Sequence, residues 1–77
     1  MAGMKTRRYA VVFEPGEDGW TIARFPAFPG CLTQGRTRAE ALANAREALQ
    51  LTVEDMVEHG EPLPDEAEAV EILEVAV

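Results

Sequence analysis

The stretch that decides the fold is FPAFPGCLTQGRTRAEAL, residues 25–42. Two prolines and two glycines fall within its first eleven residues, and a helical pattern follows without a break. Turn residues of this kind fix the direction of the chain. We therefore expect this segment to end one strand, to place another and to aim a helix back across a sheet, which is a structural task.

The strongest secondary-structure signal begins at Thr37. Thr37 and Glu40 form a capping box, in which the threonine hydroxyl accepts from the amide of residue 40 and the glutamate carboxylate accepts from the amide of residue 37. Gly60 followed by Pro62 supplies the stop. These signals predict a helix over residues 38–59. Its apolar stripe, with steps of three and four residues, is Ala41, Leu42, Ala45, Leu49, Val53, Met56 and Val57.

Three short extended segments precede this helix and one follows it. Residues 7–14 combine β-branched and aromatic side chains before the turn EPGEDG. Residues 20–25 alternate between two faces, and residues 31–35 allow a short edge strand. Residues 70–77, VEILEVAV, form the last strand. This β-β-β-α-β order indicates an α+β fold with three antiparallel strands and one long helix.

The order of the elements also suggests how the sheet is arranged. A right-handed helical crossover would return the fourth strand beside the first and parallel to it. The expected sheet order is therefore 3-2-1-4, with the helix on one face. A single helix leaves the other face of the sheet without an obvious cover, so we expect a homo-oligomer, a dimer or a tetramer.

Size and composition limit the classes of function. The 77 residues are expected to form a single domain over residues 1–77, without a separate DNA-binding domain. Hydrophobic residues make up 47% of the chain, but no apolar run is long enough to cross a membrane. No signal peptide is recognisable, so we expect a cytoplasmic protein without membrane contact. A single cysteine excludes an internal disulfide and a thiolate metal cluster.

Charge is divided unevenly along the chain. Residues 1–38 carry six basic and three acidic side chains, whereas residues 39–77 carry one basic and eleven acidic side chains. An acidic surface repels the phosphates of nucleic acids and attracts basic proteins. Direct nucleic-acid binding is therefore not expected. The alternative is that the acid only forms a solvated face that keeps the protein soluble.

No group of residues indicates catalysis. A metal-dependent nuclease needs carboxylates that converge at strand centres, but the first strand offers only Glu14, at its end. His59 lies at the predicted end of the helix, where it is expected to cap the helix. Cys31 has no histidine near it in sequence and is expected to be a small buried hydrophobe. We expect no enzyme activity, no catalytic residue, no metal and no cofactor.

The two aromatic residues outside the regular pattern raise the question of an interface. Trp20 is expected mainly in the core, because so small a domain needs its large side chains inside. Phe28, on the predicted turn, is equally compatible with the core and with an interface.

The same segments resemble a known family. YAVVFEPGEDGWTIARFP, residues 9–26, leads into a Pro-x-x-Pro-Gly-Cys turn, a Thr-x-Gly-x-Thr step and Glu-Ala-Leu, and EHGEPLP follows at residues 58–64. Together they resemble the HicB family of type II antitoxins over about residues 8–64. The resemblance implies a truncated ribonuclease H-like fold without catalytic residues. It also implies a protein inhibitor of HicA, a small basic RNA-cleaving toxin. Between the two prolines, where many members carry an acid, this chain has Ala27 and Phe28.

The leading hypothesis is therefore an interaction protein that covers the active site of a basic toxin. Carboxylates on the helix would take the place of RNA phosphates, and an aromatic residue on the turn would provide an apolar anchor. The expected contact residues are Pro26, Phe28, Pro29, Gly30, Glu47, Glu54, Asp55 and Glu58. The alternatives are an orphan structural oligomer without a toxin and a metal-dependent nuclease that combines Glu14 with carboxylates of the helix.

Overall fold

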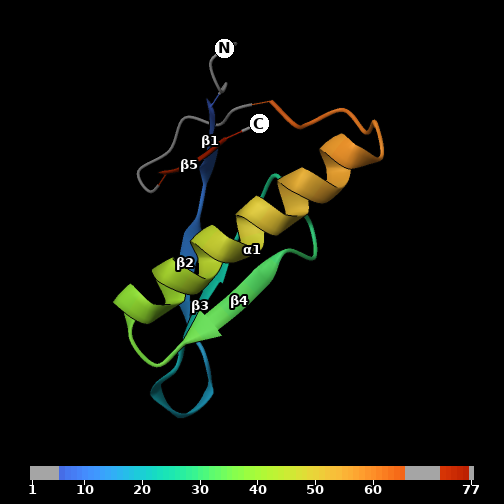
Figure 1. The fold of residues 1–77 in the computed structure, drawn as a ribbon. Helices are drawn as coiled ribbons and strands as arrows, with labels where there is room; N and C mark the ends of the chain where they lie inside the picture. Colours follow the sequence, from blue (N-terminus) through green and yellow to red (C-terminus); the bar gives the residue numbers. More distant parts are fainter. Residues whose placement is uncertain (1–5, 66–71, 77) are drawn as a thin grey trace.

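The computed structural model describes residues 6–65 and 72–76 (Figure 1). In this part of the chain, five strands, one 3-10 helix and one α-helix follow each other along the sequence. They are β1 (Thr6–Ala10), β2 (Val12–Pro15), η1 (Glu17–Gly19), β3 (Thr21–Arg24), β4 (Leu32–Gly35), α1 (Arg38–Glu58) and β5 (Ile72–Ala76). The α+β class predicted from the sequence is confirmed.

The strands pair in two antiparallel sheets. One contains β2, β3 and β4 in that order, and the other contains β1 and β5. The predicted first strand is thus divided at Val11, so a single sheet of order 3-2-1-4 and a ribonuclease H-like topology stay predictions. The predicted parallel direction of the last strand is wrong, because β5 runs antiparallel to β1. Thirteen residues, 59–71, separate α1 from β5, and a connection of that length can return the chain in either direction.

Helix α1 begins and ends at the signals found in the sequence. The hydroxyl of Thr37 accepts a hydrogen bond from the amide of Glu40 at 3.0 Å. The carboxylate of Glu40 accepts from the amide of Arg36 at 3.0 Å, one residue before the predicted donor. At the other end Gly60 takes a φ of 70°, and the amide of Glu61 donates to the carbonyl of Met56 at 2.9 Å. This is a glycine-terminated C-cap of the Schellman type, which ends the helix at Glu58.

The core lies between one face of the strands and α1. The buried residues of α1 are Ala41, Ala45, Leu49 and Val53, at steps of four along one side of the helix. Val57, predicted to belong to this stripe, is 51% exposed, because the stripe has turned away from the sheet by the last turn. Among the described residues, the buried cluster consists of Tyr9, Val11, Ala23, Phe25, Phe28, Ala41, Ala45, Leu49, Val53, Leu73 and Val75.

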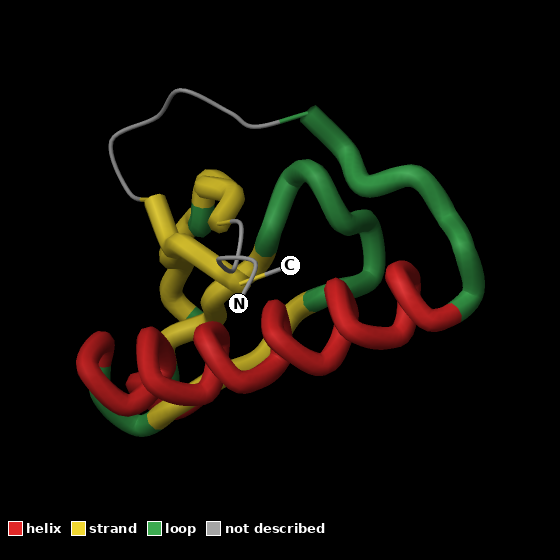
Figure 2. Tube along the Cα trace, turned by 45° about the horizontal axis from the view of Figure 1, so that its top comes forward, coloured by secondary structure: helices red, strands yellow, loops and turns green. Residues whose placement is uncertain are grey.

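Two loops meet beside the C-terminal half of α1. Figure 2 shows the turn between β3 and β4 and the chain that follows α1 lying side by side there. Tyr9 holds them together, because its hydroxyl donates to the carbonyl of Pro64 at 2.7 Å and its ring packs edge-on against Phe28 with centroids 4.7 Å apart. Both rings are buried. Trp20, in contrast, is only half-buried and lies 5.7 Å from the guanidinium of Arg36, so its predicted place in the core is wrong.

Candidate protein-interaction site

The outer side of α1 carries an exposed leucine among carboxylates. Leu51 is 59% exposed, and the four predicted acidic contact residues are exposed at positions four before it and three, four and seven after it. These spacings place all five residues on one side of the helix. We call this set, Glu47, Leu51, Glu54, Asp55 and Glu58, the acidic surface.

Neighbouring side chains hold two of these carboxylates. The side-chain amide of Gln50 donates a hydrogen bond to the carboxylate of Glu54 at 2.9 Å. The imidazole of His59 lies 2.8 Å from the backbone carbonyl of Asp55 and 3.4 Å from its carboxylate. The hydrogen bond to that carbonyl, and then the charge of the carboxylate, raise the pKa of His59 above its ordinary value near 6.5. His59 is the C-cap residue of α1, so its predicted capping role is confirmed.

The acidic surface is unfavourable for the helix that carries it. Three of its carboxylates lie in the last two turns of α1, and the last turn holds no basic residue. The C-terminal end of a helix carries partial negative charge, so an acid in the last turn costs about 0.3–1 kcal/mol. Glu54 and Glu58 are also a like-charge pair four residues apart. Helix stability therefore does not explain this cluster.

An apolar groove lies between the predicted turn and α1. Its volume is about 440 Å³, and it is lined by Ala27, Phe28, Pro29, Gly30, Cys31, Thr52, Met56 and Pro64. The thiol of Cys31 lies 3.4 Å from the hydroxyl of Thr52, which joins the turn to the helix. Cys31 is half-buried rather than fully buried as predicted, because it lines this open groove. The structure thus brings the turn and the C-terminal half of α1 together.

These elements match one described family over almost the whole chain. Residues 9–76 match the HicB-like antitoxins of bacterial toxin-antitoxin systems. This chain belongs to the HicB-like antitoxin family. The matched residues include β2, β3, β4, α1 and β5 in full. The acidic surface, which belongs to α1, therefore lies within the match.

Relatives of this HicB-like chain differ in length. A UPF0150 protein of Thermoplasma acidophilum is 41% identical over 66 residues, which cover 84% of this chain and 96% of that protein. Antitoxin HicB 1 of Photorhabdus laumondii is 44% identical over 61 residues, or 79% of this chain but only 39% of that antitoxin. A UPF0150 protein of Synechocystis is 36% identical over 69 residues, with 90% and 87% covered. The chain therefore matches some relatives over nearly their full length and the antitoxin over less than half.

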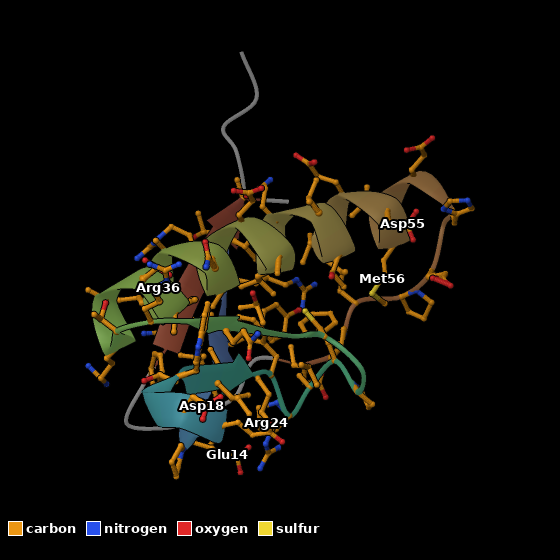
Figure 3. All side chains as sticks on the ribbon, turned by 90° about the horizontal axis from the view of Figure 1, so that it is seen from below. Glu14, Asp18, Arg24, Arg36, Asp55 and Met56 are labelled. Carbon is orange, nitrogen blue, oxygen red and sulfur yellow. The ribbon has the colours of Figure 1, made fainter. Side chains whose placement is uncertain are left out.

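Glu14, the carboxylate that the nuclease alternative requires, lies apart from the acidic surface of this HicB-like protein (Figure 3). Glu14 pairs with Arg24 through two contacts of 3.0 and 3.5 Å. Figure 3 shows both side chains on the side of the sheet turned away from α1, which carries Asp55. Glu14 therefore does not meet the helix carboxylates as the nuclease alternative requires. Within residues 6–65 and 72–76, no group of three potential metal ligands and no helix suited to cross a membrane is found.

The structure changes which residue can anchor a partner of the HicB-like chain. Pro26, Pro29 and Gly30 are exposed on the turn, as a contact requires. Phe28 is only 5% exposed and belongs to the core. Leu51, which is not among the contact residues expected from the sequence, is an exposed apolar side chain within the acidic surface. Its position off the buried stripe and between Glu47 and Asp55 was the signal that could have identified it.

Proposed function

We propose that this HicB-like protein neutralises a small, basic, RNA-cleaving toxin of the HicA type by binding over its active site. The observation that carries the proposal is the exposed Leu51 within four carboxylates, on a member of an antitoxin family. A protein that cleaves RNA presents lysine and arginine where phosphates lie. The acidic surface offers carboxylates to those cations and thereby occupies the place of the RNA.

The two chemical components of the site have different roles in binding. Exposed charges mainly raise the association rate through long-range attraction, which salt screens. An apolar side chain that loses its water on binding mainly slows dissociation. We assign the first role to the carboxylates and the second to Leu51. The exposed turn residues Pro26, Pro29 and Gly30 form the rim, and Phe28 supports the turn from inside.

Charge reversal tests the first role. In the variant Glu54→Lys/Asp55→Lys/Glu58→Lys, association with the basic product of the neighbouring reading frame should be slower by tenfold or more at low salt, and its dependence on salt should be weaker or reversed. The fold should persist, because the three side chains are exposed and lysines favour a helix C-terminus. Unchanged association at low salt by the folded variant would show that the acidic surface serves only solubility.

A matched pair of single variants separates local charge from net charge. Glu47→Lys and Glu17→Lys change the net charge equally, but Glu47 belongs to the acidic surface and Glu17 to η1 in the hairpin turn. The first should slow association more than the second. Equal effects would mean that only the overall charge of −7 attracts the partner.

The remaining expectations are part of the same proposal. We expect the protein to act in the cytoplasm, without enzyme activity and without direct contact to nucleic acid. The orphan alternative predicts no adjacent frame that encodes a small basic protein, whereas the proposed function predicts one. Self-association as a dimer or tetramer is compatible with both the proposed function and the orphan alternative.

A further inference from the structure

We propose that the apolar groove between α1 and the turn that joins β3 to β4 receives an apolar side chain of the basic partner, carried on a segment in which lysine or arginine lies beside it. This second anchor, distinct from Leu51, deepens the proposed function and rests on it. An apolar lining, two fixed walls and a rim of carboxylates support it.

The lining of the groove suits an apolar group. Among the described residues that form it none carries a charge, and the hydroxyl of Thr52 already faces the thiol of Cys31 at 3.4 Å. Figure 3 shows the side chain of Met56 between α1 and the chain that follows it, and methionine adapts its shape to what it contacts. The volume of about 440 Å³ is within the range of clefts that hold ligands. Apolar surface that lies open to water in this way favours a contact that removes the water.

Hydrogen bonds hold both walls of the groove in place. On one side, the amide of Phe28 donates to the carbonyl of Phe25 at 3.0 Å, and the amide of Cys31 donates to the carbonyl of Phe28 at 2.9 Å. On the other side, the hydroxyl of Tyr9 donates to the carbonyl of Pro64 at 2.7 Å. A groove whose walls are already ordered loses little conformational entropy when a partner enters, so more of the apolar contact appears as affinity.

Carboxylates at the rim select the occupant. Asp55 precedes Met56 on α1, Asp65 follows Pro64 on the chain after the helix, and both acids are exposed. Residues 26–31, on the remaining side, carry no charge. Acids around an apolar centre repel phosphates, anionic lipids and the same rim on a second copy, and they attract cations. The occupant is therefore an apolar side chain beside lysine or arginine, on the surface of a basic protein.

The groove adjoins the acidic surface along α1. Thr52 follows Leu51 and Met56 follows Asp55, so each of these groove residues lies about 100° around the helix from a residue of the acidic surface. One segment of the partner that lies along the C-terminal half of α1 therefore meets both. Once the first contact has formed, the second is made within the same complex, which lengthens its lifetime.

Cys31 provides the test, because its thiol lines the groove and is the single thiol of the chain. N-Ethylmaleimide adds a bulky group to this thiol and leaves the charge of the protein unchanged. The basic product of the neighbouring reading frame should then dissociate from the full chain tenfold faster or more. The effect should persist at about 1 M salt, where charges are screened. Association at low salt should stay near the rate of the unmodified protein, because the carboxylates are intact.

A displaced thiol is the matched control. In the variant Cys31→Ala/Ala39→Cys the thiol lies at an exposed position in the first turn of α1, more than three turns before Thr52. Modification of this variant should leave dissociation unchanged. Mass spectrometry measures the extent of modification, and circular dichroism and sedimentation equilibrium check the fold and the oligomeric state of each modified protein.

A second measurement uses the unmodified chain, so it does not require the modified protein to fold. Saturation with the same basic product should slow the reaction of Cys31 with N-ethylmaleimide tenfold or more, because the groove is then occupied. The thiol of the control variant should react at the same rate with and without that product.

The other results overturn the proposal in distinguishable ways. Unchanged dissociation after modification of Cys31, or a thiol that the partner does not protect, excludes the groove. If Glu54→Lys/Asp55→Lys/Glu58→Lys still slows association, the proposed function survives without it. Failure of the wild type to bind the basic product contradicts both. A thiol that is inert in the free protein would mean that the groove is closed, and a changed oligomeric state after modification would assign the groove to a contact between copies.

Discussion

Replacement of Gly35 by alanine should disrupt the contact between β4 and the start of α1. Gly35 is buried at the end of β4, and a Cβ atom there would lie 2.7 Å from the carbonyl carbon of Glu40 and 2.8 Å from the Cα atom of Ala41. Both are backbone atoms of the first helical turn, so no flexible side chain can move aside. The φ of Gly35 is not in the left-handed region, so in the folded state the cost of alanine is steric and not backbone strain.

The expected cost follows from the overlap. Ordinary contacts of a Cβ atom begin at about 3.4 Å, so one end of α1 has to move by more than half an ångström. Overpacking of a well-packed site costs about 1–3 kcal/mol and sometimes more, and the rigid backbone partners favour the upper end. Alanine also lowers the conformational entropy of the unfolded chain, and this offsets about 0.4–1 kcal/mol of the lost stability. The free energy of unfolding should therefore fall by about 2 kcal/mol.

Urea denaturation followed by circular dichroism measures this change, with Gly30→Ala as the control. Gly30 has a φ of 89°, and a Cβ atom there meets nothing within 4 Å, so the control isolates backbone strain of about 1 kcal/mol. Gly35→Ala should be the more destabilising substitution. A change smaller than that of Gly30→Ala, or no change, would refute the close approach of β4 to α1.

The remaining predictions concern Phe28 and His59. Phe28→Ala should lower the free energy of unfolding by about 3–5 kcal/mol, because its ring is buried against Tyr9, and a folded variant of near wild-type stability in urea would instead support an exposed anchor. Since the folded-state pKa of His59 is raised, its stabilising contribution is complete below about pH 6.5 and is lost as the pH rises through the raised pKa. The stability difference between wild type and His59→Asn should therefore be largest below about pH 6.5 and shrink as the pH rises above it, and a constant difference would contradict the interaction with Asp55.

Local signals in the sequence predicted the helix almost completely. The hydroxyl of Thr37 and the φ of Gly60 act within one or two turns of the chain, so residue types alone specify where α1 begins and ends. The turn after β3 was also recognisable from Pro26, Pro29 and Gly30. The position of the acidic surface followed from the helical period.

Features that depend on distant contacts could not be predicted in this way. The direction of β5 depends on a long connection rather than on its own residues. Phe28 packs inward against Tyr9, nineteen residues earlier, and the guanidinium beside Trp20 belongs to Arg36, sixteen residues later. Leu51 was overlooked because a leucine in a helix is usually assumed to be buried, whereas the twist of the helix places this one among acids.

The most direct test of the proposed binding surface compares Leu51→Ala with Leu32→Ala. The two leucines are equally exposed, and only Leu51 belongs to the acidic surface. Each variant is immobilised at low density, and the basic product of the neighbouring reading frame is passed over it. Leu51→Ala should speed dissociation of that protein by about tenfold, equivalent to about 1.4 kcal/mol, and Leu32→Ala should leave dissociation unchanged. An unchanged dissociation rate for Leu51→Ala, or a faster rate for Leu32→Ala alone, would contradict binding through the acidic surface.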